Sequence, residues 1–245
     1  MKNFIRLSLV SALVFSSSSS YASSTSNVAG AAINEGSNKV EFRTSYSFDD
    51  KDSKDKVFQT RIHYDRGIND WFGIRLVLPQ KKTNSDSWEH QEVSTEFKFQ
   101  LFEKDIDGFD AGFRLIYDYA DGDKKPDDFK ISTHFNKKIG DIYFINHNVF
   151  SHNVGQDSTD GISAETRFAG WYEISCENSL KAGIEMFNKF GNLRFLSGYN
   201  NQNHRVGTLI KGKLNDKISF KFGPQFGISE NSTDYGFGMF LGYKF

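Results

Sequence analysis

Tyr235-Gly-Phe-Gly-Met-Phe-Leu-Gly-Tyr-Lys-Phe245 is the stretch that decides the fold. Read with a period of two, one face carries Tyr235, Phe237, Met239, Leu241, Tyr243 and Phe245, and the other carries Gly236, Gly238, Phe240, Gly242 and Lys244. This alternation predicts a β-strand with a large apolar face and a mostly small or polar opposite face. A strand of about 10 residues of this kind suits a membrane-spanning barrel, and a soluble sheet could also use it.

The same alternation recurs along most of the chain and predicts eleven further strands. They cover about 38–48, 57–66, 71–79, 92–101, 109–119, 128–137, 142–152, 163–174, 180–186, 203–214 and 218–228. The segment 142–152 is the least regular, because aromatic and aliphatic residues fall on both of its faces. Residues 188–202 fit either a long external loop or an extension of the strands on each side. The pattern predicts an all-β, antiparallel up-and-down transmembrane barrel of twelve strands over residues 38–245.

The connections between these strands alternate in length. Short links at 67–70, 139–141, 175–179 and 215–217 alternate with mostly longer, polar and charged links. An even strand count with short turns at one end and longer loops at the other is typical of outer-membrane barrels, and it places both termini on the periplasmic side. The link 102–108 is longer than such a turn usually is.

A secreted β-sandwich would also alternate apolar and polar residues. Three features favour the barrel. Nearly every predicted strand has a complete apolar face, whereas the edge strands of a sandwich carry breakers. Aromatic residues gather near strand ends, as membrane interfaces require. The opposite faces carry many charges, which suits a wet lumen.

The N-terminus has the features of a secretory signal peptide over residues 1–22. Lys2 and Arg6 precede a short apolar run, and Ser20-Tyr21-Ala22 forms a small-x-small cleavage site. Residues 23–37 are small and polar, and we expect a flexible periplasmic leader there. Cys176 is the one cysteine of the sequence, so no internal disulfide can form. The net charge of −1 gives no indication of nucleic-acid binding.

The signal sequence, the alternating strands and the ending Gly242-Tyr243-Lys244-Phe245 together resemble bacterial outer-membrane β-barrel proteins of Gram-negative cells. The resemblance implies that Tyr243 and Phe245 are the signature read by the barrel-insertion machinery, and that outer-membrane lipid and lipopolysaccharide surround the chain. The strand count, the size and the Val40–Arg43 and Thr60-Arg61 segments are also similar to small monomeric porins for acidic sugars, such as the oligogalacturonate-specific type. That similarity implies a monomer through which small solutes pass.

The side chains predicted to face the lumen are the candidate functional residues. Thirteen are basic: Arg43, Arg61, Arg75, Lys98, Arg114, Lys130, Arg167, Lys181, Arg205, Lys211, Lys213, Lys221 and Lys244. Nine are acidic: Glu41, Asp65, Glu92, Glu96, Asp110, Asp118, Glu165, Glu173 and Glu185. Thirteen minus nine leaves a surplus of about four positive charges, which favours the passage of small anions. Alternatively, the charges pair across strands and fill a modest twelve-stranded lumen as a polar plug.

Two other classes of function stay open. An outer-membrane lipid hydrolase would need a Ser–His pair, often His-x-Ser on one strand face. His152 lies near a predicted rim, but position 154 is Val, so a serine from another strand would have to complete the site. A non-conducting scaffold or adhesin acting through its loops is the third class. We predict no catalytic residue and no cofactor. We also predict no metal site, because the charged loops 49–56 and 121–128 lack the spacing of an EF-hand loop.

Overall fold

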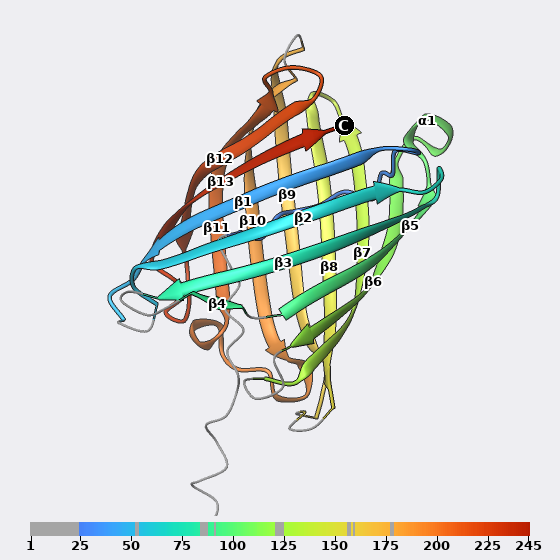
Figure 1. Cartoon of the computed structure of the whole chain (residues 1–245). Coiled ribbons are helices and arrows are strands. Elements are labelled where there is room, and N and C mark those ends of the chain that lie inside the picture. The colour runs from blue at the N-terminus through green and yellow to red at the C-terminus, as the bar shows by residue number, and fades with distance from the viewer. Residues whose placement is uncertain are drawn as a thin grey trace, which may run out of the picture.

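The computed structural model describes residues 25–51, 54–83, 88–90, 92–120, 125–155, 158, 160–176 and 179–245. Within these ranges, twelve long antiparallel strands form one closed barrel (Figure 1). They are β1 (Asn38–Phe48), β2 (Val57–Gly67), β3 (Phe72–Thr83), β5 (Glu92–Phe102), β6 (Asp110–Ala120), β7 (Asp127–Ile139), β8 (Ile142–Val154), β9 (Ser163–Ser175), β10 (Leu180–Asn192), β11 (Asn203–Lys213), β12 (Ile218–Gly227) and β13 (Tyr235–Lys244). The predicted twelve-stranded fold is confirmed.

The barrel closes where the first and last strands meet. β1 and β13 pair over ten positions, from Lys39 opposite Lys244 to Phe48 opposite Tyr235. Beyond the strand, the N–H of Phe245 donates a hydrogen bond of 3.1 Å to the carbonyl oxygen of Asn38. Closure removes the unpaired edges that would otherwise expose backbone polar groups to lipid.

Side chains on the outer face of the barrel are apolar and exposed, whereas those on the inner face are mostly buried. The alternation along β13 shows this difference. Tyr235 and Leu241 are about half exposed, whereas Phe240 between them is 4% exposed. Large hydrophobic side chains are exposed in the same way on the other long strands. In a soluble protein such a surface would aggregate, but it is the surface that a transmembrane barrel presents to lipid.

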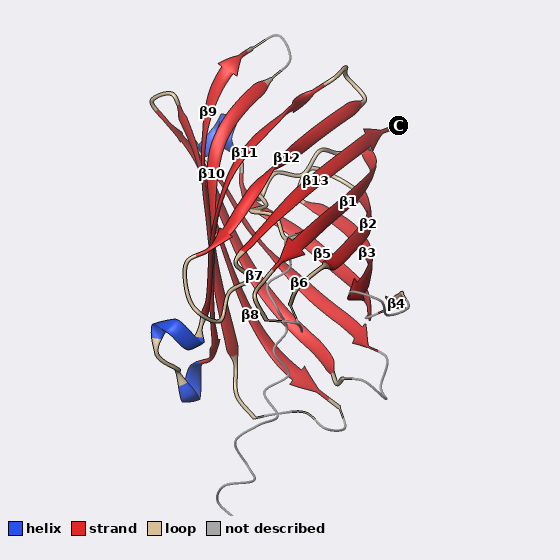
Figure 2. Ribbon diagram, turned by 90° about the vertical axis from the view of Figure 1, so that its left-hand side faces the viewer, coloured by secondary structure: helices blue, strands red, loops and turns tan. Residues whose placement is uncertain are grey.

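Short elements occupy the two ends of the barrel (Figure 2). The 102–108 link contains one helical turn, α1 (Lys104–Asp107), and Gly108 ends it in the left-handed conformation, with φ of 77°. Cys176 is exposed in the turn after β9. No helix in the described ranges is long and apolar enough to cross a membrane.

At the end of the barrel opposite α1, strands extend further than the sequence pattern predicts. β3 continues to Thr83 instead of ending at position 79, and it pairs there with the two-residue strand β4 (Glu89–His90). The region 188–202 combines both expected forms. β10 continues to Asn192, and a loop follows with the 3-10 turns η1 (Leu193–Phe195) and η2 (Tyr199–Asn201).

At the end of the barrel opposite α1, two loops are joined by hydrogen bonds from lysine side chains. Lys54 Nζ donates to the carbonyl oxygen of Asn231 at 2.6 Å, and Lys51 Nζ donates to that of Glu230 at 2.9 Å. Burial lowers the pKa of Lys54, which is 6% exposed. The loop after β1 therefore packs on the loop after β12.

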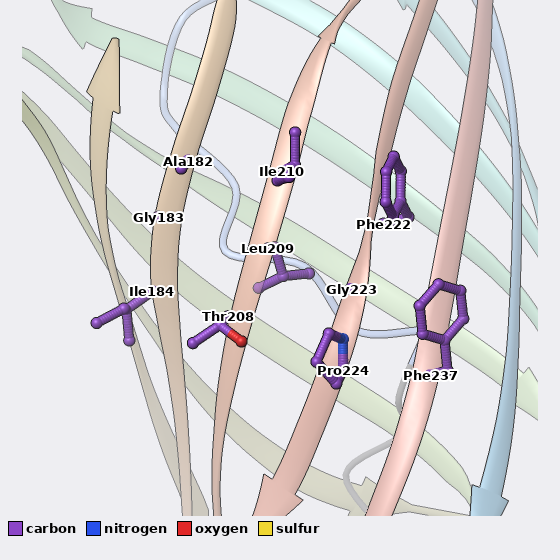
Figure 3. Close-up of a pocket in the computed structure, with 10 residues that line it drawn as sticks. All are labelled: Ala182, Gly183, Ile184, Thr208, Leu209, Ile210, Phe222, Gly223, Pro224 and Phe237. Carbon is purple, nitrogen blue, oxygen red and sulfur yellow. The ribbon is translucent and has the colours of Figure 1, made fainter. Parts of the chain in front are cut away.

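Pro224 interrupts the ladder between β11 and β12. Proline has no N–H to donate, and the paired register skips Thr208 and Leu209. An apolar groove of about 560 Å³ lies over this position (Figure 3). Exposed side chains such as Ile210 and Phe222 line it, so the groove opens on the outer face of the barrel.

The stretch before β1 departs most from the prediction. Instead of a flexible periplasmic leader, residues 25–33 form a luminal segment inside the barrel, where Thr25 is fully buried and Val28 is 4% exposed. Shortly before β1, the N–H of Gly36 donates a hydrogen bond to the carbonyl oxygen of Gly67 at 3.0 Å. The predicted signal peptide lies outside the described residues.

Candidate functional site: the charged lumen

Fifteen of the charged residues predicted to face the lumen are candidates for lining a pore, and all fifteen lie on the inner face, buried or half-buried. They are Arg43, Arg61, Arg75, Lys98, Arg114, Lys130, Arg167, Arg205, Lys211, Lys221, Glu41, Glu96, Asp118, Glu165 and Glu185. Their neighbours along each strand point outward and are mostly apolar. The period of two of a β-strand therefore gathers side chains from all parts of the chain around one axis.

One network of ion pairs joins four neighbouring strands. Asp65 on β2 contacts Arg75 Nε on β3 at 2.9 Å and Lys98 Nζ on β5 at 3.1 Å. Glu96 on β5 contacts Arg114 Nη1 on β6 at 2.9 Å and Arg75 Nη1 at 3.5 Å. These side chains are less than a fifth exposed, so water screens the network weakly. On this side of the wall, the expected cross-strand pairing is present.

Elsewhere the lumen contains smaller groups of paired charges. The pairs include Glu41 with Lys39 and Arg43, Asp118 and Asp128 with Lys130, Glu92 with Lys125, Glu165 with Arg167, Glu173 with Lys181, and Glu185 with Lys221. Pairing alone does not neutralise the lumen, because basic residues outnumber acidic residues on the inner face.

The surplus of positive charge is concentrated where arginine side chains lie close to one another. Arg43 and Arg61 occupy directly opposed positions in the β1–β2 ladder. Arg167 on β9 and Arg205 on β11 pair with the same residue of β10, so they lie level with one another. Arg43 and Arg167 donate to carbonyl oxygens of the luminal segment that are two residues apart. Like charges from distant strands therefore share one region of the lumen, and this region is suited to attract anions.

The lumen also contains an apolar patch that the sequence analysis missed. Its members are Ile145, Ala169, Trp171, Phe187 and Leu209, covered by Val28 of the luminal segment. Two cations lie against it: Lys211 Nζ is 3.7 Å from the centre of the Trp171 ring, and the Arg205 guanidinium is 5.3 Å from that of Phe187. Continuing the alternation of β10 to position 187 and of β11 through position 209 would have revealed it.

A serine and a histidine meet inside the lumen. Ser132 Oγ and His134 Nε2 are 2.8 Å apart, and His134 Nδ1 is 2.8 Å from the carbonyl oxygen of Ala29. The search for His-x-Ser missed this pair because its order is Ser-x-His. Ser132 is fully buried, and a carbonyl instead of a carboxylate orients the ring, so the pair lacks the access and the acid that nucleophilic catalysis needs.

The hydrolase candidate His152 is engaged elsewhere, because its Nδ1 lies 2.9 Å from the carbonyl oxygen of Gly161. In the ranges that the structure describes, no three potential metal ligands gather into one group. The charged inner wall is therefore the feature with the clearest chemical capacity, namely binding and guiding charged solutes.

Comparison with known proteins identifies the fold. No family model matches the sequence, and no curated protein matches it. Solved structures do match. A structure titled "KdgM porin" aligns with a TM-score of 0.59 at 7% identity over 84% of this chain and 99% of its own. The "NanC porin" structure aligns with a TM-score of 0.60 at 9% identity over 84% of this chain and 100% of its own.

A further match is titled "KdgM porin in complex with disordered oligogalacturonate", with a TM-score of 0.58 and 8% identity. At these identities the alignments show a shared architecture and carry no residue-level correspondence. The chain has the fold of the KdgM and NanC porins, in agreement with the resemblance noted in its sequence.

Proposed function

We propose that this protein is an outer-membrane channel for the passive diffusion of small hydrophilic solutes, with a preference for anions. The observation that carries the proposal is the inner wall, where arginines from β1, β2, β9 and β11 share one region of the lumen. Porins of the same fold, one of them solved with an oligogalacturonate, support a channel in this membrane. We further propose that the barrel works as a monomer and is inserted through its Tyr243 and Phe245 signature.

The positive lumen would act through local concentration. A cationic wall surrounded by low-dielectric material attracts anions and repels cations. The effect depends on ionic strength, because the Debye length falls from about 10 Å at 0.1 M salt to about 3 Å at 1 M. Anion preference should therefore be strongest in dilute buffer.

A liposome-swelling assay tests the proposed channel. Purified protein in liposomes should admit gluconate faster than glucose, a neutral solute of similar size, and the difference should shrink in concentrated salt. Equal rates for both solutes would remove the anion preference. Swelling no faster than that of protein-free liposomes would remove the channel itself.

Substitution of the facing arginines tests their role. Replacing Arg43, Arg61 and Arg205 together with glutamine removes three positive charges from the lumen and should shift the zero-current potential toward cation preference. The matched control replaces three exposed lysines at chain turns and strand ends, Lys104, Lys138 and Lys217, with glutamine. The control has the same net charge and should keep the parent potential. An identical shift in both triple variants would show that the luminal position of the charges is irrelevant.

A further inference from the structure

The luminal segment, residues 25–33, is bound by the inner wall as an extended ligand would be. It has no regular secondary structure, yet Thr25, Ser26, Val28 and Ala31 are each less than a tenth exposed. Buried backbone polar groups need partners, and the barrel wall supplies them. The N–H of Ala31 donates to Asn136 Oδ1 at 2.9 Å, and the N–H of Ile33 donates to Gln100 Oε1 at 2.6 Å.

Three arginines hold the carbonyl oxygens of the segment. Arg43 Nη1 donates to that of Thr25 at 3.3 Å, Arg167 Nη1 to that of Asn27 at 3.3 Å, and Arg114 Nη2 to that of Gly30 at 3.2 Å. The three arginines come from β1, β9 and β6, which are well separated in the barrel. The segment therefore crosses the lumen and does not follow one wall.

The same three arginines share a second feature. Each guanidinium uses other nitrogens to bind a carboxylate on the wall: Arg43 binds Glu41, Arg167 binds Glu165 and Arg114 binds Glu96. The nitrogen that points into the lumen is the one that binds the segment. The segment thus occupies the positions at which a passing anion would meet these arginines.

Side chains of the luminal segment also contact the barrel wall. Val28 covers the apolar patch around Trp171, and the side-chain oxygen of Asn27 accepts a hydrogen bond of 2.6 Å from Lys221 Nζ. In contrast, the contacts with arginine are long and go to neutral carbonyl oxygens. An anion adds the attraction of a full opposite charge, which a neutral carbonyl oxygen lacks. A carboxylate or phosphate should therefore compete well for the same nitrogens.

We propose that the luminal segment is an intramolecular ligand of the anion pathway, which it obstructs, and that permeating anions compete with it for Arg43, Arg114 and Arg167. This inference rests on the proposed channel function. It predicts that the segment lowers conductance and that its position in the lumen responds to anions.

A disulfide can report the position of the segment. A Cβ atom built at Gly30 lies 3.3 Å from Cγ of Asn136, which is where the sulfur of a cysteine at that position would lie. This spacing is close to what a disulfide requires. The test variant combines Gly30→Cys and Asn136→Cys with Cys176→Ser, so that no other thiol is present. Gly30→Cys with Cys176→Ser alone is the control for oxidation without a partner.

The first readout needs no conductance. Oxidation of the folded double-cysteine variant in detergent should form the disulfide, measured as loss of free thiols, and citrate should slow its formation severalfold relative to KCl of equal ionic strength. No disulfide would mean that the segment does not occupy the lumen. Equal rates in citrate and KCl would overturn the competition.

The second readout is conductance in planar bilayers. Deleting residues 25–33 should raise single-channel conductance by roughly twofold or more, because a twelve-stranded lumen is narrow and the segment crosses it. The oxidised variant should stay at or below the parent value and be insensitive to citrate. A deletion variant with parent conductance would overturn the obstruction and leave the channel intact. If neither protein conducts although the disulfide forms, the proposed channel fails, and the obstruction fails with it.

Discussion

Replacing Glu185 with glutamine is expected to lower the free energy of unfolding by about 3 kcal/mol, because it leaves a buried ammonium group without its counter-charge. Glu185 is fully buried on the inner face, and its carboxylate oxygens lie 2.9 and 3.0 Å from Lys221 Nζ. The same ammonium group also makes a cation–π contact, 4.3 Å from the centre of the Phe240 ring. The substitution therefore keeps the shape of the site and removes its negative charge.

Urea unfolding of the barrel in lipid vesicles, followed by its shift in electrophoretic mobility, measures this change. The matched control is Glu173→Gln, because Glu173 lies 3.5 Å from Lys181 and its side chain is 32% exposed. Exposed pairs of this kind contribute about 0–1 kcal/mol. Adding Lys221→Met to Glu185→Gln should recover most of the loss, since no unpaired charge then remains. Equal effects at Glu185 and Glu173 would contradict the burial of the pair.

The second large effect is expected at Gly183. A Cβ atom there would lie 2.4 Å from the carbonyl oxygen of Gly170 and 2.5 Å from Cε3 of Trp171, distances that real contacts do not tolerate. The Trp171 ring is 1% exposed and packs in the apolar patch of the lumen, so it has little room to move. We expect Gly183→Ala to cost about 1–3 kcal/mol through overpacking.

Gly170→Ala is the matched control for this substitution. Gly170 lies on the adjacent strand, opposite Ile184, and a Cβ atom there would lie 3.7 Å from Cγ2 of Ile142, an ordinary contact. The same urea titration should show a large loss for Gly183→Ala and little change for Gly170→Ala. Similar stabilities for the two variants would show that Gly183 has room for a methyl group and would contradict this packing.

Much of the architecture could be predicted because a barrel repeats one local rule. Alternation at Tyr235–Phe245 and along the earlier strands specifies which side chains face outward, and closure follows from the need to pair every edge. The same rule places Arg43, Arg61 and Arg205 on the inner wall. Local pattern is informative here because lipid and lumen impose opposite demands on successive residues.

Features that depend on long-range partners could not be predicted in this way. Residues 25–33 have no apolar period, so composition alone favours a flexible leader, whereas their backbone is held by arginines distant in sequence. Phe187 and Leu209 form an apolar patch on a face that the pattern treats as polar. The extension of β3 to Thr83 follows from its pairing with β4. Residues 80–83 are polar, so their pattern does not predict this pairing.

The zero-current potential across a planar bilayer with a salt gradient tests the central claim most directly. KCl is at 0.1 M on one side and at a tenfold lower concentration on the other. The purified protein should give a potential that is negative on the dilute side, because chloride crosses more easily than potassium. The deletion variant lacking residues 25–33 should show the same sign with a larger current. Cation preference in both proteins, or an absence of current from both, would contradict an anion pathway lined by Arg43, Arg61 and Arg205.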